Sequence, residues 1–279
     1  MFRTIQRYVT LFGSLFIVAL VAIPLVWAMG SDRGVAGPTI SDAVSPGWGV
    51  VALVLGIAFM ALVACVAGRV INPAVALFIL GCGIGVLAMR SGTVADFAWE
   101  GGSLWALGIE TLIWGVVVGL LALLVFRVTG GMSDVPREWN SPEAGSWEAL
   151  KSRESMICWT FGILALPIAW VFLAADAKGQ VLGAAFVGSM IAGMVGRIVV
   201  PKIDPILLFS GPILCGGIAQ LVIASGFSEP LADSLVTGAL PRLTWIMPVD
   251  WAAGSLAGVA FGLGLARSFV LGPQDVTAC

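Results

Sequence analysis

The sequence contains no histidine, which removes the most frequent metal ligand, the usual haem ligand and the commonest general base near neutral pH. Its five cysteines include no C-x-x-C pair, and four of them lie inside or at the edge of apolar segments, where cysteine acts as a small buried hydrophobic residue. No Ser/His, paired-Asp or metal-ligand pattern occurs. We therefore predict that the chain is not an enzyme and holds neither a metal nor another cofactor.

Charged residues are also scarce. They make up 11% of the 279 residues, whereas soluble globular proteins carry about 25%. Hydrophobic residues make up 59%, so the chain cannot cover a water-facing surface and is predicted to be a polytopic membrane protein whose main partner is the lipid bilayer. The net charge of −2 and the lack of long basic runs give no reason to expect a nucleic-acid partner.

Eight apolar segments are long enough to cross a bilayer, which takes roughly 20 residues. They cover residues 10–29, 48–67, 73–89, 103–127, 157–175, 181–200, 205–224 and 251–271. The first segment follows Arg3 and Arg7 as a signal peptide would, but its apolar stretch exceeds the roughly 7–15 residues of such a signal. We therefore interpret it as a helix of the mature protein.

The basic residues predict an orientation, because Lys and Arg favour cytoplasmic loops. With the N-terminus inside, ten of the fourteen basic residues fall on the cytoplasmic side and four outside. Both termini are then cytoplasmic, and we expect an integral protein of the bacterial plasma (inner) membrane. The longest cytoplasmic loop would cover residues 128–156.

Short motifs recur in the same order in the two halves of the chain. The matched pairs are Phe12-Gly13 with Phe161-Gly162, Gly68-Arg69 with Gly196-Arg197, Asn72-Pro73 with Asp204-Pro205, Cys82-Gly83 with Cys215-Gly216, and Trp105 with Trp251. Because each half holds an even number of spans, both enter the membrane in the same direction. We predict an all-α polytopic membrane protein of eight transmembrane helices in two parallel four-helix repeats, with residues 1–127 as the first, 128–156 as a cytoplasmic linker, and 157–279 as the second repeat and a short tail.

The two Asn/Asp-Pro steps are predicted to start helices. Asn and Asp are favoured N-caps, and Pro is favoured at the first helical position. Asn72 and Asp204 would therefore cap the third and seventh spans instead of binding a solute. Arg69 and Arg197, just before these steps, would lie near helix C-termini and extend to lipid head groups.

Few polar residues lie inside the spans. Glu110 is the one acidic residue well inside an apolar segment, and intramembrane charge is costly enough to suggest a function. It would either line a cavity and handle a solute or protons, or face lipid and extend outward. Gln220, in the seventh span, is a second polar candidate that favours helix–helix hydrogen bonding. Gly254, Gly258 and Gly262 form a packing face for a neighbouring helix or for a second copy of the chain.

These features favour a small-solute transporter or channel-like protein. The alternative is a non-catalytic scaffold or assembly subunit of a membrane complex, in which small-residue faces contact another copy or another membrane protein. Polar groups converging in mid-bilayer would favour transport, and a sealed apolar bundle with an outer groove would favour the scaffold.

Overall fold

A computed structural model describes residues 2–31, 36–37, 39–41, 43–132, 134–135 and 145–270. Within these ranges the regular structure is helical, apart from an isolated bridge between Gly30 and Ala36. The predicted all-α polytopic class is confirmed. The predicted C-terminal tail, with Cys279, and residues 136–144 of the predicted linker lie outside the described residues.

Eight helical spans of the described chain are long and apolar enough to cross a membrane, as predicted. The first four are α1 (Phe2–Leu25) with the 3-10 segment η1 (Val26–Met29), α2 (Pro46–Val70), α3 (Pro73–Arg90) and α5 (Leu104–Thr129). The last four are α7 (Arg153–Thr160) with η2 (Phe161–Leu164) and α8 (Ala165–Phe172), α9 (Lys178–Val199), η3 (Leu207–Phe209) with α10 (Gly211–Gly226), and α12 (Pro248–Val270). The connections contain α4 (Val94–Trp99), α6 (Trp147–Lys151), α11 (Leu231–Thr237) and η4 (Arg242–Trp245).

Proline explains why two spans of the second half are not continuous α-helices. A proline lacks the N–H for the i−4 bond, and its ring clashes with that carbonyl. Pro167 makes this conflict with Ile163, which lies within η2, where the fifth span narrows to a 3-10 turn. Pro212 would make the same conflict in a helix that had begun at Pro205. The seventh span instead starts with η3, and α10 begins at Gly211 with Pro212 in its first turn.

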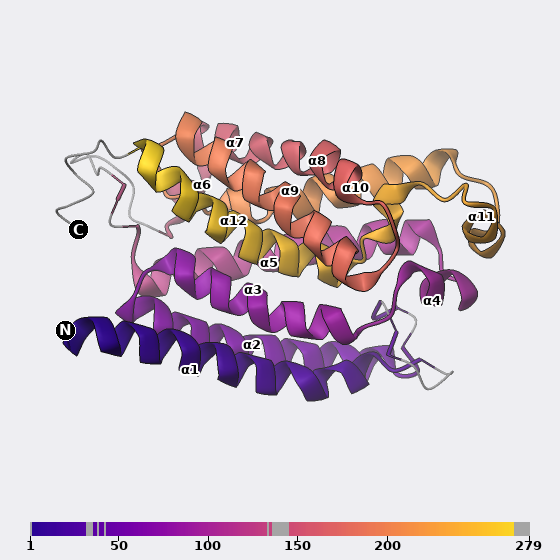
Figure 1. Ribbon diagram of the computed structural model, residues 1–279, viewed down its shortest axis with the longest axis horizontal. Helices are drawn as coiled ribbons and strands as arrows, with labels where there is room; N and C mark the ends of the chain where they lie inside the picture. The colour runs from indigo at the N-terminus through magenta and orange to yellow at the C-terminus, as the bar shows by residue number, and fades with distance from the viewer. Residues whose placement is uncertain are drawn as a thin grey trace.

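The spans form an elongated bundle of roughly aligned helices. Figure 1 shows α1 and α2 along one side, α7 and α8 along the other, and α3, α5 and α12 between them. The start of α1 and the end of α12 lie at the same end of the bundle, and α4 and α11 lie at the opposite end (Figure 1). The end of the bundle with the start of α1 and the end of α12 is called the terminal end below, and the opposite end is called the α4–α11 end.

Packing between the two halves is reciprocal. The third span of the first half, α3, packs along the last span of the second half, α12, while α10 packs along α5. Under the sequence repeat, each of these contacts is the counterpart of the other. Each half also has a short helix between its third and fourth spans, and these two helices, α4 and α11, pack together. This is the pattern that a duplicated unit would produce, but the two-repeat arrangement and its boundaries stay a prediction.

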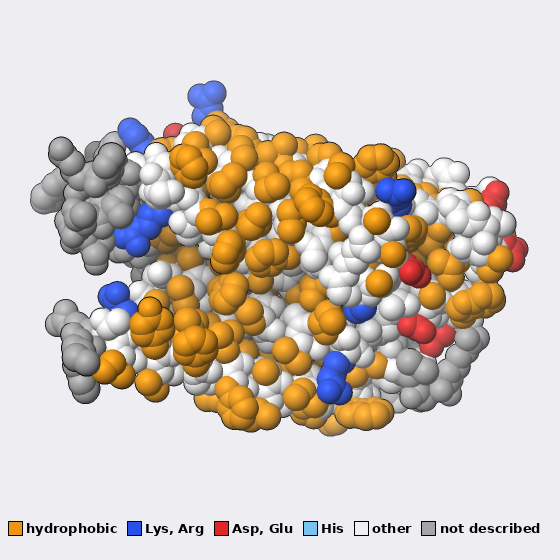
Figure 2. Space-filling model, viewed as in Figure 1, with side chains coloured by type: hydrophobic (Ala, Val, Ile, Leu, Met, Phe, Trp, Pro, Cys, Tyr) orange, Lys and Arg blue, Asp and Glu red, His pale blue; other side chains and the backbone are white. Residues whose placement is uncertain are grey.

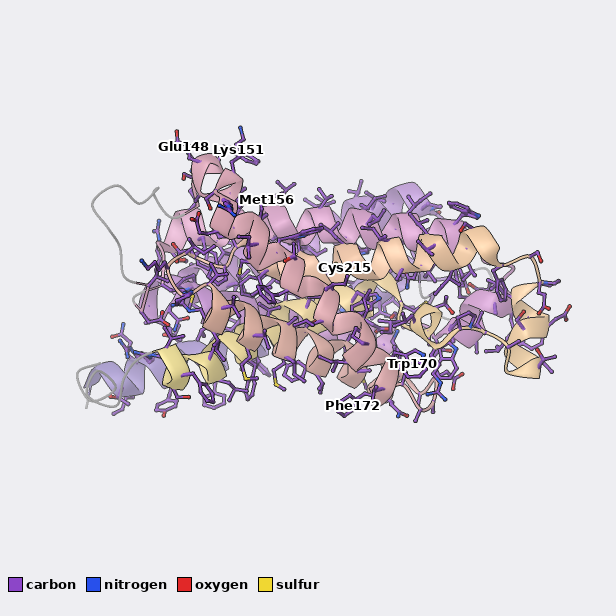
Figure 3. All side chains as sticks on the ribbon, turned by 90° about the horizontal axis from the view of Figure 1, so that it is seen from above. Glu148, Lys151, Met156, Trp170, Phe172 and Cys215 are labelled. Carbon is purple, nitrogen blue, oxygen red and sulfur yellow. The ribbon has the colours of Figure 1, made fainter. Side chains whose placement is uncertain are left out.

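The outer surface is apolar in the middle and charged toward the ends. Figure 2 shows hydrophobic side chains covering the central part of one face, with most charged groups nearer the two ends. Seen from above, Met156, Trp170 and Phe172 project outward from α7 and α8, whereas Glu148 and Lys151 project from α6 at the terminal end (Figure 3). The three apolar side chains are each at least half exposed, as expected of residues that face lipid.

Candidate functional site

Glu110 lies in the second turn of α5, and its carboxylate holds the connection between α1 and α2. The N–H of Ile40 donates to the two carboxylate oxygens at 3.0 and 3.2 Å, and the N–H of Ser41 donates to one of them at 3.4 Å. The side chain is only 8% exposed. Hydrogen bonds from backbone N–H groups stabilise a carboxylate away from bulk water. The structure therefore gives Glu110 a positioning contact with a loop.

The same carboxylate lies at one end of an apolar groove between α2 and α5, with a volume of about 540 Å³. The groove opens on the outer surface of the bundle, because Val54 and Ile113, which line it, are 60% and 57% exposed. Among the described residues that line it, Ser41 and Glu110 are the polar ones, apart from the indole N–H of Trp114. These lining residues are Ile40, Ser41, Pro46, Val50, Leu53, Val54, Ile57, Ala106, Ile109, Glu110, Ile113, Trp114 and Val117.

Gln220 is completely buried and links three segments of the bundle. Its side-chain oxygen accepts a hydrogen bond from the Thr111 hydroxyl at 2.7 Å, and its nitrogen donates to the Ile246 carbonyl at 2.8 Å. The amide thus joins α10 to α5 and to the segment just before α12. Although Thr111 follows Glu110 in the sequence, the hydrogen bonds connect Glu110 to the loop and Thr111 to Gln220. The two polar residues chosen from the sequence have different partners.

The two predicted helix caps have different outcomes. Asn72 is the N-cap of α3, and its Oδ1 accepts the N–H of Val75 at 2.8 Å. The prediction that Asp204 caps the seventh span is wrong, because that span begins with η3, whose N-cap is Ile206, and α10 follows with Ser210 at the N-cap position. The Oδ1 of Asp204 instead accepts the N–H of Met132 at 2.9 Å, from the segment that follows α5.

The interpretation of Arg197 as a residue that extends to lipid head groups is also wrong. Its side chain is fully buried at the end of α9. The guanidinium lies 3.3 Å from Oδ2 of Asp134 and donates to the carbonyls of Pro201 and Ile203 at 2.9 and 3.1 Å. The short turn after α9 folds back over the guanidinium and supplies these carbonyls. The repeated Gly-Arg motif gave no sign of this, because the partners lie in other segments.

A second buried ion pair lies at the other end of α9. Nζ of Lys178 is 3.0 Å from the carboxylate of Asp250 and donates to the carbonyl of Gly92 at 2.9 Å. Asp250 is fully buried and also accepts the N–H of Met247 at 3.1 Å, so it stabilises the start of α12. Lys178 therefore links α9 and α12 to the segment that follows α3. Sequence reasoning missed this pair, because its members lie 72 residues apart in the first turns of two different helices.

The three glycines of α12 form an internal contact with α9. A Cβ atom on Gly254 would lie 2.6 Å from Cβ of Ala185, and one on Gly258 or Gly262 would clash with the carbonyl oxygens of Phe186 or Met190. Residues without a side chain are required here because the two helix backbones approach closely. The sequence suggested either a neighbouring helix or a second copy of the chain as the partner of this face, and the structure shows that the face packs against the neighbouring helix α9.

The described residues contain no group of three or more His, Cys, Asp or Glu side chains arranged to hold a metal ion. The four cysteines among them, Cys65, Cys82, Cys158 and Cys215, are not paired in disulfides. Comparison with known proteins adds no further assignment, since no protein-family model, curated protein or solved structure matches this chain.

Proposed function

We propose that this integral membrane protein is a non-catalytic scaffold or assembly subunit of a membrane complex. One observation carries the proposal: Glu110 and Gln220, the polar side chains that could have marked a solute path, both bond to other parts of the chain. In a path through the bilayer, such groups would be turned toward water or toward the solute. The groove between α2 and α5 is apolar and opens on the outer surface, so it offers a solute no polar path through the bundle.

The contacts between the two halves support the same proposal. Gly108 and Gly115 of α5 pack against the side chains of Leu221 and Leu214 of α10. On the other side of the interface, Gly81 of α3 packs against Leu256 and the backbone of α12. Glycine opposite a large apolar side chain gives a close, dry contact. A bundle closed in this way is suited to holding a fixed shape against a membrane partner.

A small-solute transporter or channel is the second candidate, favoured by the position of Glu110 beside a groove large enough for a ligand. Water access to the bundle interior distinguishes the two candidates. Ser189 of α9 and Ser255 of α12 are fully buried, whereas Ser228 is exposed at the α4–α11 end. Each would be changed to Cys in a chain whose native cysteines are replaced, and the variants treated in membranes with a charged thiol reagent.

The scaffold proposal predicts labelling of Ser228→Cys and none of Ser189→Cys or Ser255→Cys. Labelling of either interior position at a rate close to that of Ser228→Cys would show that water enters the bundle, and it would favour transport instead. A scaffold also predicts that mild detergent extracts the protein in a particle whose protein mass, without the bound detergent, exceeds the 28.9 kDa of its own chain. Extraction as a single chain would contradict the assembly role.

We further propose that the terminal end faces the cytoplasm. Among residues whose side chains are described, eight basic residues lie at that end, namely Arg7, Arg69, Arg127, Lys151, Arg153, Arg197, Lys202 and Arg267, and three lie at the other. This bias follows the positive-inside rule. Glu148→Cys and Val236→Cys, at opposite ends, should label from opposite sides of the membrane in intact cells, with only Val236→Cys accessible from outside. Labelling of both from one side would reject the topology.

A further inference from the structure

The length of the groove between α2 and α5, measured along the helices, distinguishes between a lipid chain and a transmembrane helix as its occupant. Its lining runs from Pro46 to Ile57 on α2 and from Ala106 to Val117 on α5. At 1.5 Å per residue, each stretch is about 16 Å long. The hydrocarbon core is about 30 Å thick, so the groove covers about one leaflet. A transmembrane helix would need a contact surface through both leaflets, whereas a lipid chain extends through only one.

The low polarity of the groove lining also suits a hydrocarbon chain. Glu110 is the only charged residue among the described residues that line the groove, and its carboxylate accepts the N–H groups of Ile40 and Ser41. These contacts turn the charge toward the loop and leave side chains such as Leu53, Ile109 and Trp114 to form the wall. A surface whose described residues carry no free charge matches an acyl chain and does not match a lipid head group.

The loop gives the groove a closed end. Ile40 and Ser41 lie at the α4–α11 end, at the start of α2, and the bonds to Glu110 hold them beside the groove. An occupant therefore enters sideways from the membrane, where Val50, Val54 and Ile113 are exposed. If the groove stayed empty, its walls would lose dispersion contacts on one side.

We propose that this groove is a binding site for one acyl chain of a phospholipid from the leaflet at the α4–α11 end. The chain lies along α2 and α5, and its glycerol and head group stay outside, near the loop. Inside a bilayer the hydrophobic effect gives no preference for protein over lipid, so the site holds its chain by close packing. This inference is independent of the scaffold proposal, because both a scaffold and a transporter can bind a lipid.

The test uses the full-length protein in vesicles of phosphatidylethanolamine and phosphatidylglycerol that contain a small amount of phospholipid with a diazirine on one acyl chain. Photocrosslinked positions are mapped by mass spectrometry. Glu110 is left out of the comparison, because carboxylates trap the diazo by-product wherever the chain lies. The reference surface is the lipid-facing side of α1, where Phe12 and Phe16 are 64% and 65% exposed.

Two variants of α2 provide a matched comparison. Val54 lines the groove and is 60% exposed, whereas Val66 lies outside it on the same helix and is 59% exposed. In Val54→Trp the indole fills the groove, and in Val66→Trp it faces bulk lipid. Because both side chains point outward, neither change disturbs the packed interior.

We expect several-fold more crosslinking at residues 46–57 and 106–117 than on α1, in the wild type and in Val66→Trp. In Val54→Trp this excess should fall to the level of α1. Equal labelling of the groove and of α1 in the wild type would overturn the proposal, as would a Val54→Trp variant that keeps the excess. Crosslinks from these segments to a second protein chain would instead show that a helix occupies the groove.

Discussion

Removal of the Glu110 carboxylate should release the loop that it holds. In Glu110→Ala, the N–H groups of Ile40 and Ser41 lose the acceptors that they have at 3.0–3.4 Å. An unsatisfied buried donor costs about 1–3 kcal/mol, and the low end applies here because Ser41 is exposed and water can reach it. Two donors at about 1 kcal/mol each give a loss of about 2 kcal/mol in the free energy of loop opening, or roughly 30-fold in the opening equilibrium.

The assay is amide hydrogen exchange of the purified protein, followed at Ile40 and Ser41. Glu110→Ala should speed exchange at both amides by roughly 30-fold, a change that follows from the lost contacts. Glu110→Gln keeps one carbonyl oxygen as an acceptor, so its effect on exchange should be smaller than that of Glu110→Ala. Within this variant, exchange should increase more at Ser41 than at Ile40. Glu148→Ala, an exposed carboxylate at the other end of the bundle, is the control and should leave both rates unchanged.

Unchanged exchange in Glu110→Ala would refute this reasoning, since the carboxylate would then not hold the loop. The result also bears on function. If Glu110→Ala leaves exchange unchanged but alters solute or proton flux in vesicles, the residue belongs to a transport path, and the scaffold proposal loses the observation on which it rests.

Three further predictions concern stability, each measured by thermal unfolding in detergent. Arg197→Ala should cost about 3–5 kcal/mol, because it leaves the buried partner of an ion pair unpaired; a change below about 1 kcal/mol would mean that the pair is screened by water. Gly258→Ala should destabilise by about 1–3 kcal/mol through overpacking against α9. Gly264→Ala is its control on the same helix and should not destabilise, because nothing lies within 4 Å of the new Cβ. Asn72→Ser should preserve the cap of α3, whereas Asn72→Ala should cost about 0.5–2 kcal/mol, and equal losses in the two would contradict the cap.

The sequence alone predicted the features that depend on local composition and spacing. Long apolar segments must form helices in a bilayer, because lipid offers no hydrogen-bond partners to the backbone. The eight spans could therefore be recognised before any packing was known. The cap at Asn72 could also be predicted, because a cap accepts a backbone N–H only a few residues away in the sequence. The glycines of α12 similarly indicated a packing face, although not its partner.

Tertiary structure decided every contact between distant segments. Asp204 resembles Asn72 in sequence, yet it bonds to Met132, because Pro212 moves the start of α10 beyond it. Arg197 becomes buried only because the chain after α9 folds over it and Asp134 lies opposite. Glu110 could be identified as unusual, but its bond to a loop 70 residues earlier could not. A span forms because its own residues transfer favourably into lipid, so its position can be predicted from a local stretch of sequence. The pairings depend on which helices become neighbours, and no local stretch of sequence specifies those neighbours.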